Sequence, residues 1–202
     1  MASDPDAALM VAFQGGDESA FRSLFEKYGR AMVAFCQHFV HDLARAEELA
    51  QDVFLKLHRS AGRYQPTARF KTFLYRIASN HCLNELRRGE YGARRALESA
   101  DEQAGSRGEP ADPDSLPGPA PTPEDAALAA ALGRSVERLL ASLPEKQRAA
   151  FVLGRLEGLS YEEIAEVLAT TVPAVKSLVH RATVAAAAAL APYALGGKEA
   201  LP

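Results

Sequence analysis

Apolar side chains recur at helical spacing along most of this chain of 202 residues, with polar residues between them. No segment alternates with a period of two for long, so we expect helices and not strands. A predicted N-cap at Asp17 and breaks at Gly62 and Pro66 separate the first helices. Their apolar stripes are Phe21, Leu24, Phe25 and Tyr28; Val53, Phe54 and Leu57; and Phe70, Phe73, Leu74 and Ile77.

The helical pattern stops at the stretch GSRGEPADPDSLPGPAPTPED, which holds six of the twelve prolines. So few large apolar residues cannot form a core, and we predict a flexible linker at 97–122. It separates two predicted helical domains, 5–96 and 123–192, and residues 193–202 form a tail. The predicted fold class is therefore all-α, with two small helical domains joined by a Pro-rich linker.

The second domain carries the pattern of a helix-turn-helix. Helix starts are predicted at Pro123 and after Leu143-Pro144, and Ser160 with Glu163 forms a capping box. A short turn over 169–172 leads into a last helix that begins near Pro173. A 100° step per residue puts one set of its side chains toward Ile164 and Leu168 and the other set outward. The inward set is Val175, Val179, Ala182 and Ala186, and the outward set is Pro173, Lys176, Ser177, His180 and Val184.

The net charge of −3 hides a basic segment. Residues 55–95 contain ten Lys or Arg against two Glu, interleaved with aromatic side chains. Cations neutralise phosphates, and aromatic rings stack on unpaired bases, so the segment is a candidate nucleic-acid surface. Phe70, Phe73 and Ile77 are better explained as core. Residues off that stripe are candidates for nucleic-acid contact, namely Lys71, Tyr75, Arg76 and Asn80.

The segment ARAEELAQDVFLKL is a predicted acidic helix with an apolar stripe. Such a helix is either a solvated surface or a docking surface for a basic protein partner. The sequence contains no phosphate-binding glycine loop and no HExxH or CxxC motif, so we expect neither an enzyme nor a cofactor. We also expect no metal site. Cys36 and Cys82 do not form a disulfide framework, and no signal peptide or membrane span is predicted, which favours a cytoplasmic protein.

Four motifs in order resemble those of an extracytoplasmic-function (ECF) sigma factor of the sigma-70 family. DESAFRSLFEKYG resembles the first helix, and AEELAQDVFLKLHR resembles the segment that docks on the β′ clamp helices of RNA polymerase. FKTFLYRIASNHCLNELRR resembles the segment that melts the promoter and reads its −10 element. LPEKQRAAFVLGRLEGLSYEEIAEVLATTVPAVKSLVHRA resembles the domain that reads the −35 element.

The resemblance implies a sigma factor that binds core polymerase, through the β′ clamp helices and the β flap, and promoter DNA. It also implies an anti-sigma factor as partner. The implied core-binding residues are Glu47, Glu48, Gln51, Asp52 and Leu55. The implied −10 residues are Arg63, Tyr64, Arg69, Lys71, Tyr75, Arg76, Asn80, Asn84, Arg87 and Arg88. The implied −35 residues are Thr170, Thr171, Pro173, Ala174, Lys176, Ser177, His180 and Arg181.

The chain departs from this family at several positions. Phe73 stands where the melting helix usually carries Trp. Leu178 and Thr183 stand where Arg is common, and alanines replace a basic tail. These changes either weaken binding to the −35 element or form a protein interface. In the first case, each lost phosphate contact also lowers the salt dependence of DNA binding. Two alternatives to a sigma factor are a plain helix-turn-helix regulator and a sigma-like protein that acts mainly through protein binding.

Overall fold

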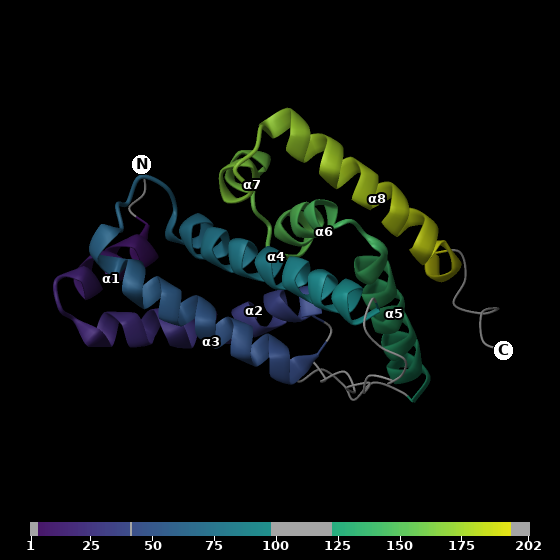
Figure 1. The fold of residues 1–202 in the computed structure, drawn as a ribbon, viewed down its shortest axis with the longest axis horizontal. Helices are drawn as coiled ribbons and strands as arrows, with labels where there is room; N and C mark the ends of the chain where they lie inside the picture. The colour runs from purple at the N-terminus through teal and green to yellow at the C-terminus, as the bar shows by residue number, and fades with distance from the viewer. Residues whose placement is uncertain (1–3, 41, 98–122, 195–202) are drawn as a thin grey trace.

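The computed structural model describes residues 4–40, 42–97 and 123–194, and all regular elements in these ranges are helical (Figure 1). The N-terminal unit comprises α1 (Pro5–Gln14), α2 (Glu18–Val40), α3 (Leu43–Ser60), η1 (Ala61–Arg63) and α4 (Phe70–Leu97). The C-terminal unit comprises α5 (Pro123–Ser142), α6 (Glu145–Phe151), the π-helical turn η2 (Val152–Leu156), α7 (Tyr161–Val167) and α8 (Val172–Ala194). The all-α expectation is confirmed for these ranges. Residues 98–122 of the predicted linker lie outside them.

Side-chain caps begin several of these helices where the sequence predicts them. Asp17 accepts a hydrogen bond from the Ser19 N–H at the start of α2, at 2.9 Å. Ser160 and Glu163 form the predicted capping box of α7. Asp4 caps two helices, because its Oδ1 accepts from the Asp6 N–H (3.0 Å) and its Oδ2 accepts from the Phe70 N–H (2.7 Å). One carboxylate therefore ties the start of α1 to the start of α4.

The core of the N-terminal unit forms where α1, α3 and α4 pack around α2. Some of its largest fully buried side chains lie on the predicted stripes, and others lie outside them. Asp6 joins α1 to α2, since it pairs with Lys27 (2.6 Å) and accepts a hydrogen bond from the Tyr28 hydroxyl (2.6 Å). The core side chains include Met10, Leu24, Met32, Phe35, Phe39, Leu49, Leu57, Phe70 and Leu74.

Helix α4 is buried on two sides, because α2 and α3 pack on one side and α6 and α7 on the other (Figure 1). This corrects the single-stripe interpretation of the segment. Phe73 and Ile77 are only half-buried, whereas Tyr75, expected off the stripe, is fully buried. The Tyr75 ring packs edge-on against Phe35 with centroids 5.0 Å apart. A helix enclosed by two layers has no single apolar face.

The C-terminal unit folds as the predicted helix-turn-helix. Val175, Val179, Ala182 and Ala186 of α8 are buried, and Pro173, Lys176, Ser177, His180 and Val184 are exposed, as expected. The turn between α7 and α8 places Ala169 at a φ of 48°. None of the described helices is long and apolar enough to cross a membrane.

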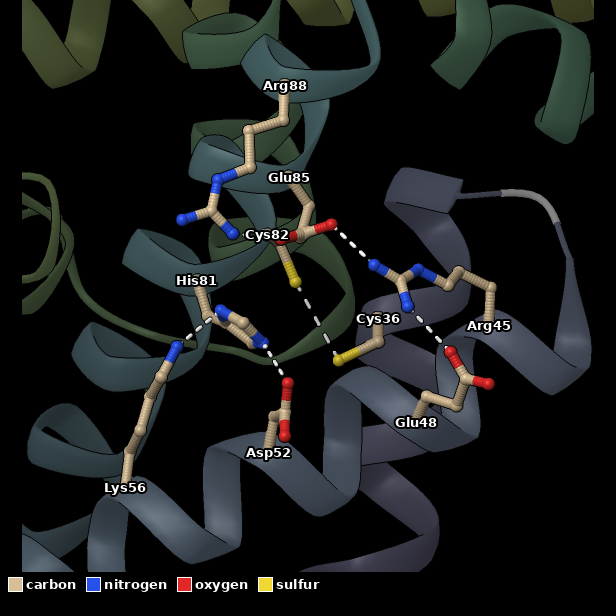
Figure 2. Close-up of polar contacts among 9 residues, drawn as sticks. All are labelled: Cys36, Arg45, Glu48, Asp52, Lys56, His81, Cys82, Glu85 and Arg88. Atoms are coloured by element: carbon tan, nitrogen blue, oxygen red, sulfur yellow. Dashed lines mark hydrogen bonds and ion pairs between the residues drawn. The ribbon is translucent and has the colours of Figure 1, made fainter. Parts of the chain in front are cut away.

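A chain of polar contacts centred on the buried His81 joins α3 to α4, with Lys56 and Asp52 exposed at its ends (Figure 2). Lys56 donates to His81 Nδ1, and His81 Nε2 donates to Asp52 Oδ2 at 3.2 Å. These roles define a neutral imidazole with its proton on Nε2. Burial and then the Lys56 charge lower the pKa of His81, against the opposing effect of Asp52. His81 therefore links the two helices in its uncharged form.

We expect Asp4→Ala to lower the free energy of unfolding by about 2 kcal/mol, because it removes two caps of about 1 kcal/mol each. Asp17→Ala is the matched control and should cost about half as much, because Asp17 caps one helix. Urea unfolding followed by circular dichroism measures both. A loss from Asp4→Ala no larger than that from Asp17→Ala would contradict the double cap.

The His81 pKa predicts a pH dependence of stability. Since the folded state resists protonation, the unfolded state binds more protons, and stability falls as the pH drops below the ordinary value of 6.5. We expect His81→Gln to reduce this slope between about pH 6.5 and pH 5, above the range where carboxylates dominate. Unfolding in urea across this pH range tests it. The exposed His180→Gln is the control and should keep the wild-type slope.

Candidate polymerase and nucleic-acid interfaces

The outward face of α3 carries the five residues expected to bind core polymerase, and all of them are exposed. Its inward face is buried against the core through Leu49, Val53 and Leu57. Leu55 is 52% exposed on the same helix as these carboxylates. The exposed Phe25 of α2 packs on α3 as well, since its ring lies 4.8 Å from that of Phe54. The result is an acidic helix face with an exposed leucine at its C-terminal end.

Two carboxylates of this face, those of Glu48 and Asp52, are held by neighbouring side chains (Figure 2). His81 donates to Asp52, as described above. Arg45 donates to Glu48 and to Glu85 of α4, both at 2.6 Å. Burial alone would raise the pKa of Glu85, but hydrogen bonds from Arg45 and Arg88 outweigh it and lower the pKa. Glu85 is therefore held ionised between two cations, and it connects α3 with the predicted DNA-binding residue Arg88.

Sequence reasoning did not identify Arg45 and His81 as supporting residues. The three-residue spacing of Arg45 and Glu48 on one helix was a usable local signal. Glu85 lies forty residues from Arg45 in the chain, so no local pattern indicates their contact. His81 lies 29 residues from Asp52, so its contact with α3 leaves no local pattern either.

The ten residues expected to read the −10 element divide by exposure. Arg63, Asn80, Asn84, Arg87 and Arg88 are exposed, as is Arg69. Lys71 and Arg76 are about 40% exposed at their side chains. Tyr64 and Tyr75 are both buried. The Tyr64 ring packs on the Phe73 ring, with their centroids 5.0 Å apart. In this arrangement neither tyrosine ring is accessible to a base.

Carboxylates of the C-terminal unit face five of these ten residues. Glu157 accepts a hydrogen bond from the Tyr75 hydroxyl, and its carboxylate lies 3.9 Å from Lys71 Nζ. Lys71 also donates to the Glu157 backbone carbonyl at 2.6 Å. The remaining ion pairs are Arg69–Glu163 at 3.9 Å, Arg76–Glu166 at 3.5 Å and Arg87–Glu145 at 3.4 Å.

The residues expected at the −35 element gather at the start of α8. All of them are exposed except Ala174, which is half-buried. The Thr171 hydroxyl accepts from the Ala174 N–H at 3.4 Å and so helps to cap α8. Leu178 packs partly against the core, and the Thr183 hydroxyl donates to the Val179 carbonyl at 2.8 Å. The outward side of the first turns of α8 is thus polar and accessible.

The two cysteines lie together in the core, one on α2 and one on α4. Cys36 and Cys82 are free thiols with their sulfur atoms 3.7 Å apart. The Cys82 thiol donates to Cys36, and this hydrogen bond together with burial raises the pKa of Cys82. The described ranges contain no cluster of three or more His, Cys, Asp or Glu that could hold a metal ion.

Both units match sigma-70 families. Residues 24–90 match sigma-70 region 2, and residues 133–184 match sigma-70, region 4. The chain is 35% identical over 196 residues to the RNA polymerase sigma-H factor of Pseudomonas aeruginosa, covering 95% of this chain and 97% of that one. It is 32% identical over 182 residues to the ECF RNA polymerase sigma-E factor of Escherichia coli K12, covering 88% and 90%.

Two solved structures share this fold at 22% sequence identity. CnrH in complex with the cytosolic domain of CnrY has a TM-score of 0.65, covering 94% of this chain and 99% of that one. RpoE of Bartonella quintana in complex with the anti-sigma factor NepR has a TM-score of 0.64, covering 85% and 96%. The sequence relatives decide between the alternatives left open by the sequence alone. The chain belongs to the ECF class of the sigma-70 family, and it is a non-enzymatic sigma factor for transcription initiation.

Proposed function

We propose that this sigma factor binds core polymerase and promoter DNA through separate surfaces on two domains, residues 5–96 and 123–192. The outward face of α3 binds the β′ clamp helices of core RNA polymerase. Helix α4, with the segment before it, reads and melts the −10 element. The start of α8 reads the −35 element, and the C-terminal unit docks on the β flap. Residues 97–122 join the two domains.

The acidic face of α3, with the exposed Leu55 at its C-terminal end, carries this proposal. Its side chains are Glu47, Glu48, Gln51, Asp52 and Leu55, and none of them contributes to the core. An exposed apolar residue next to charged side chains is typical of a protein interface, in which apolar groups are desolvated and the polar rim stays solvated. Arg45 orients the Glu48 carboxylate before docking, and His81 orients the Asp52 carboxylate. A plain DNA-binding regulator has no use for such a face.

The exposed polar residues of α4 support a role in reading unpaired bases. Asn80 and Asn84 offer amide groups to base edges, and Arg87 and Arg88 offer cations to phosphates. Unstacking a base costs a few kcal/mol, which contacts to the base and the flanking phosphates offset. Arg63 and Arg69, on the segment before α4, extend the cationic surface toward the same strand.

The polar start of α8 supports a reading role in the major groove. Lys176, Ser177, His180 and Arg181 are exposed on the side opposite the buried stripe. Thr170 and Thr171 lie at the turn, where hydroxyl groups reach backbone phosphates in a helix-turn-helix. The alanines further along α8 lie beyond the reach of base edges.

We also propose that the chain works in the cytoplasm and binds an anti-sigma factor. The fold matches two solved structures that each contain a partner, CnrH with the cytosolic domain of CnrY and the sigma factor RpoE with the anti-sigma factor NepR. Run-off transcription with purified core polymerase and a genomic promoter pool tests the overall function. Failure to initiate, together with failure to co-purify with core, would contradict it.

Leu55→Ala should raise the dissociation constant for core polymerase about tenfold, because it removes the exposed apolar side chain of the docking face. Fluorescence anisotropy of the labelled chain titrated with core measures this. Val184→Ala is the matched control, since Val184 is 56% exposed on α8, away from the proposed docking face. Equal effects of the two substitutions, or none from Leu55→Ala, would contradict the assignment of α3.

Asn80→Ala should reduce promoter opening about tenfold or more and leave core binding unchanged, because Asn80 is exposed and outside the core. Permanganate reactivity of unpaired thymines reports opening, and anisotropy with core reports binding. If both measurements fall together, Asn80 supports the fold and does not read DNA.

A further inference from the structure

The contacts between α4 and the C-terminal unit bear on when the −10 residues are available. Five of the ten proposed −10 residues are occupied by the chain's own carboxylates. These come from α6, from the residue after η2 and from α7, and each glutamate lies more than fifty residues beyond its own partner in the chain. Phosphate oxygens of bound DNA would compete with these carboxylates for the same side chains, since both are anionic oxygen acceptors for Lys and Arg.

The centre of this contact is buried and specific. Tyr75 is fully buried, and Thr72 beside it is 1% exposed. The Glu157 side chain is only 14% exposed and receives both the Tyr75 hydroxyl and the Lys71 ammonium group. Burial, reinforced by the hydrogen bond to Glu157, raises the pKa of Tyr75, so its hydroxyl stays protonated and can donate. Each of these groups would need water or another acceptor if the units separated.

A second contact holds the units together away from the glutamates. Arg148 of α6 is 7% exposed and donates to the backbone carbonyl of Phe39, near the end of α2, at 3.3 Å. The last carbonyls of a helix lack partners within it, so this arginine satisfies one of them from the other unit. The two units are therefore joined at α4 and at the end of α2.

The polymerase-docking face lies elsewhere. Helix α3 packs on α4, and Figure 1 shows α6 and α7 on the other side of α4. The residues Glu47, Glu48, Gln51, Asp52 and Leu55 stay exposed while the C-terminal unit is seated. The closed arrangement thus leaves the α3 face available and occupies part of the proposed −10 surface, where Arg63, Asn80, Asn84 and Arg88 stay exposed.

We propose that the C-terminal unit is an internal cover for the −10 surface in the free chain, with Glu157, Glu163 and Glu166 in place of DNA phosphates. The cover rests on the proposed role of α4 in reading DNA. A chain closed in this way can dock on core polymerase through α3, but Lys71, Tyr75 and Arg76 become available to the −10 element only after the units separate. Apparent affinity for single-stranded DNA falls in proportion to the open fraction.

The test uses the full chain carrying Glu157→Gln together with Glu166→Gln. Glu163 is left unchanged because its side chain closes the capping box of α7. The matched control carries Glu137→Gln together with Glu162→Gln, which makes the same change in net charge at two exposed positions of the same unit. Small-angle scattering measures the radius of gyration, and anisotropy measures binding to a fluorescent single-stranded oligonucleotide of mixed sequence.

The interface variant should be more expanded than the wild type and bind the oligonucleotide about fivefold more tightly, as expected when two partly exposed ion pairs are lost. The control variant should match the wild type in both measurements. Equal tightening in the two variants would overturn the cover, because the gain would then come from net charge alone. An interface variant that neither expands nor binds more tightly would overturn it as well.

Run-off transcription with core polymerase separates the cover from the proposed function. If the wild type initiates and the interface variant stays compact, only the cover fails. If the variant expands and binds the oligonucleotide more tightly but neither chain initiates with core, the promoter-reading proposal fails and the closed packing stands.

Discussion

The enclosure of α4 between two layers of helices is the constraint on which the other features depend. Its apolar residues pack on α2 and α3, and its remaining sides meet α6 and α7. A tyrosine enclosed in this way needs an acceptor for its hydroxyl, because an unpaired buried hydroxyl costs a few kcal/mol. Glu157 supplies that acceptor for Tyr75. The position of one glutamate after η2 thus follows from the burial of one ring on α4.

The same helix also supports the docking face on α3. His81 and Glu85 extend from α4 toward α3 and hold Asp52 directly and Glu48 through Arg45 (Figure 2). Exposed carboxylates on a lone helix would sample several rotamers, and ordering them would cost free energy at docking. Partners on the adjacent helix remove part of that cost beforehand. The proposed surfaces for polymerase and for DNA therefore share one scaffold.

The residues of α8 proposed to contact DNA lie in its first turns, and small residues further along pack against the other helices. Its first turns carry the polar residues, and its small buried residues Ala182 and Ala186 let it approach the helices beneath it closely. Leu178, which stands where the family often has Arg, packs partly against the core, and the Thr183 hydroxyl bonds to its own helix. Both side chains are thereby engaged within the domain, while Val184 remains exposed.

The helices, several of their caps and the two faces of α8 could be predicted from the sequence, because these depend on residues three or four positions apart. The acidic face of α3 could be predicted as well, because only one side of that helix is solvated. The burial of Tyr64 and Tyr75, and the pairing of Arg69, Lys71, Arg76 and Arg87 with glutamates of the C-terminal unit, depend on contacts between distant segments. A helix covered on two sides shows no single stripe, and ion pairs between distant segments leave no local pattern.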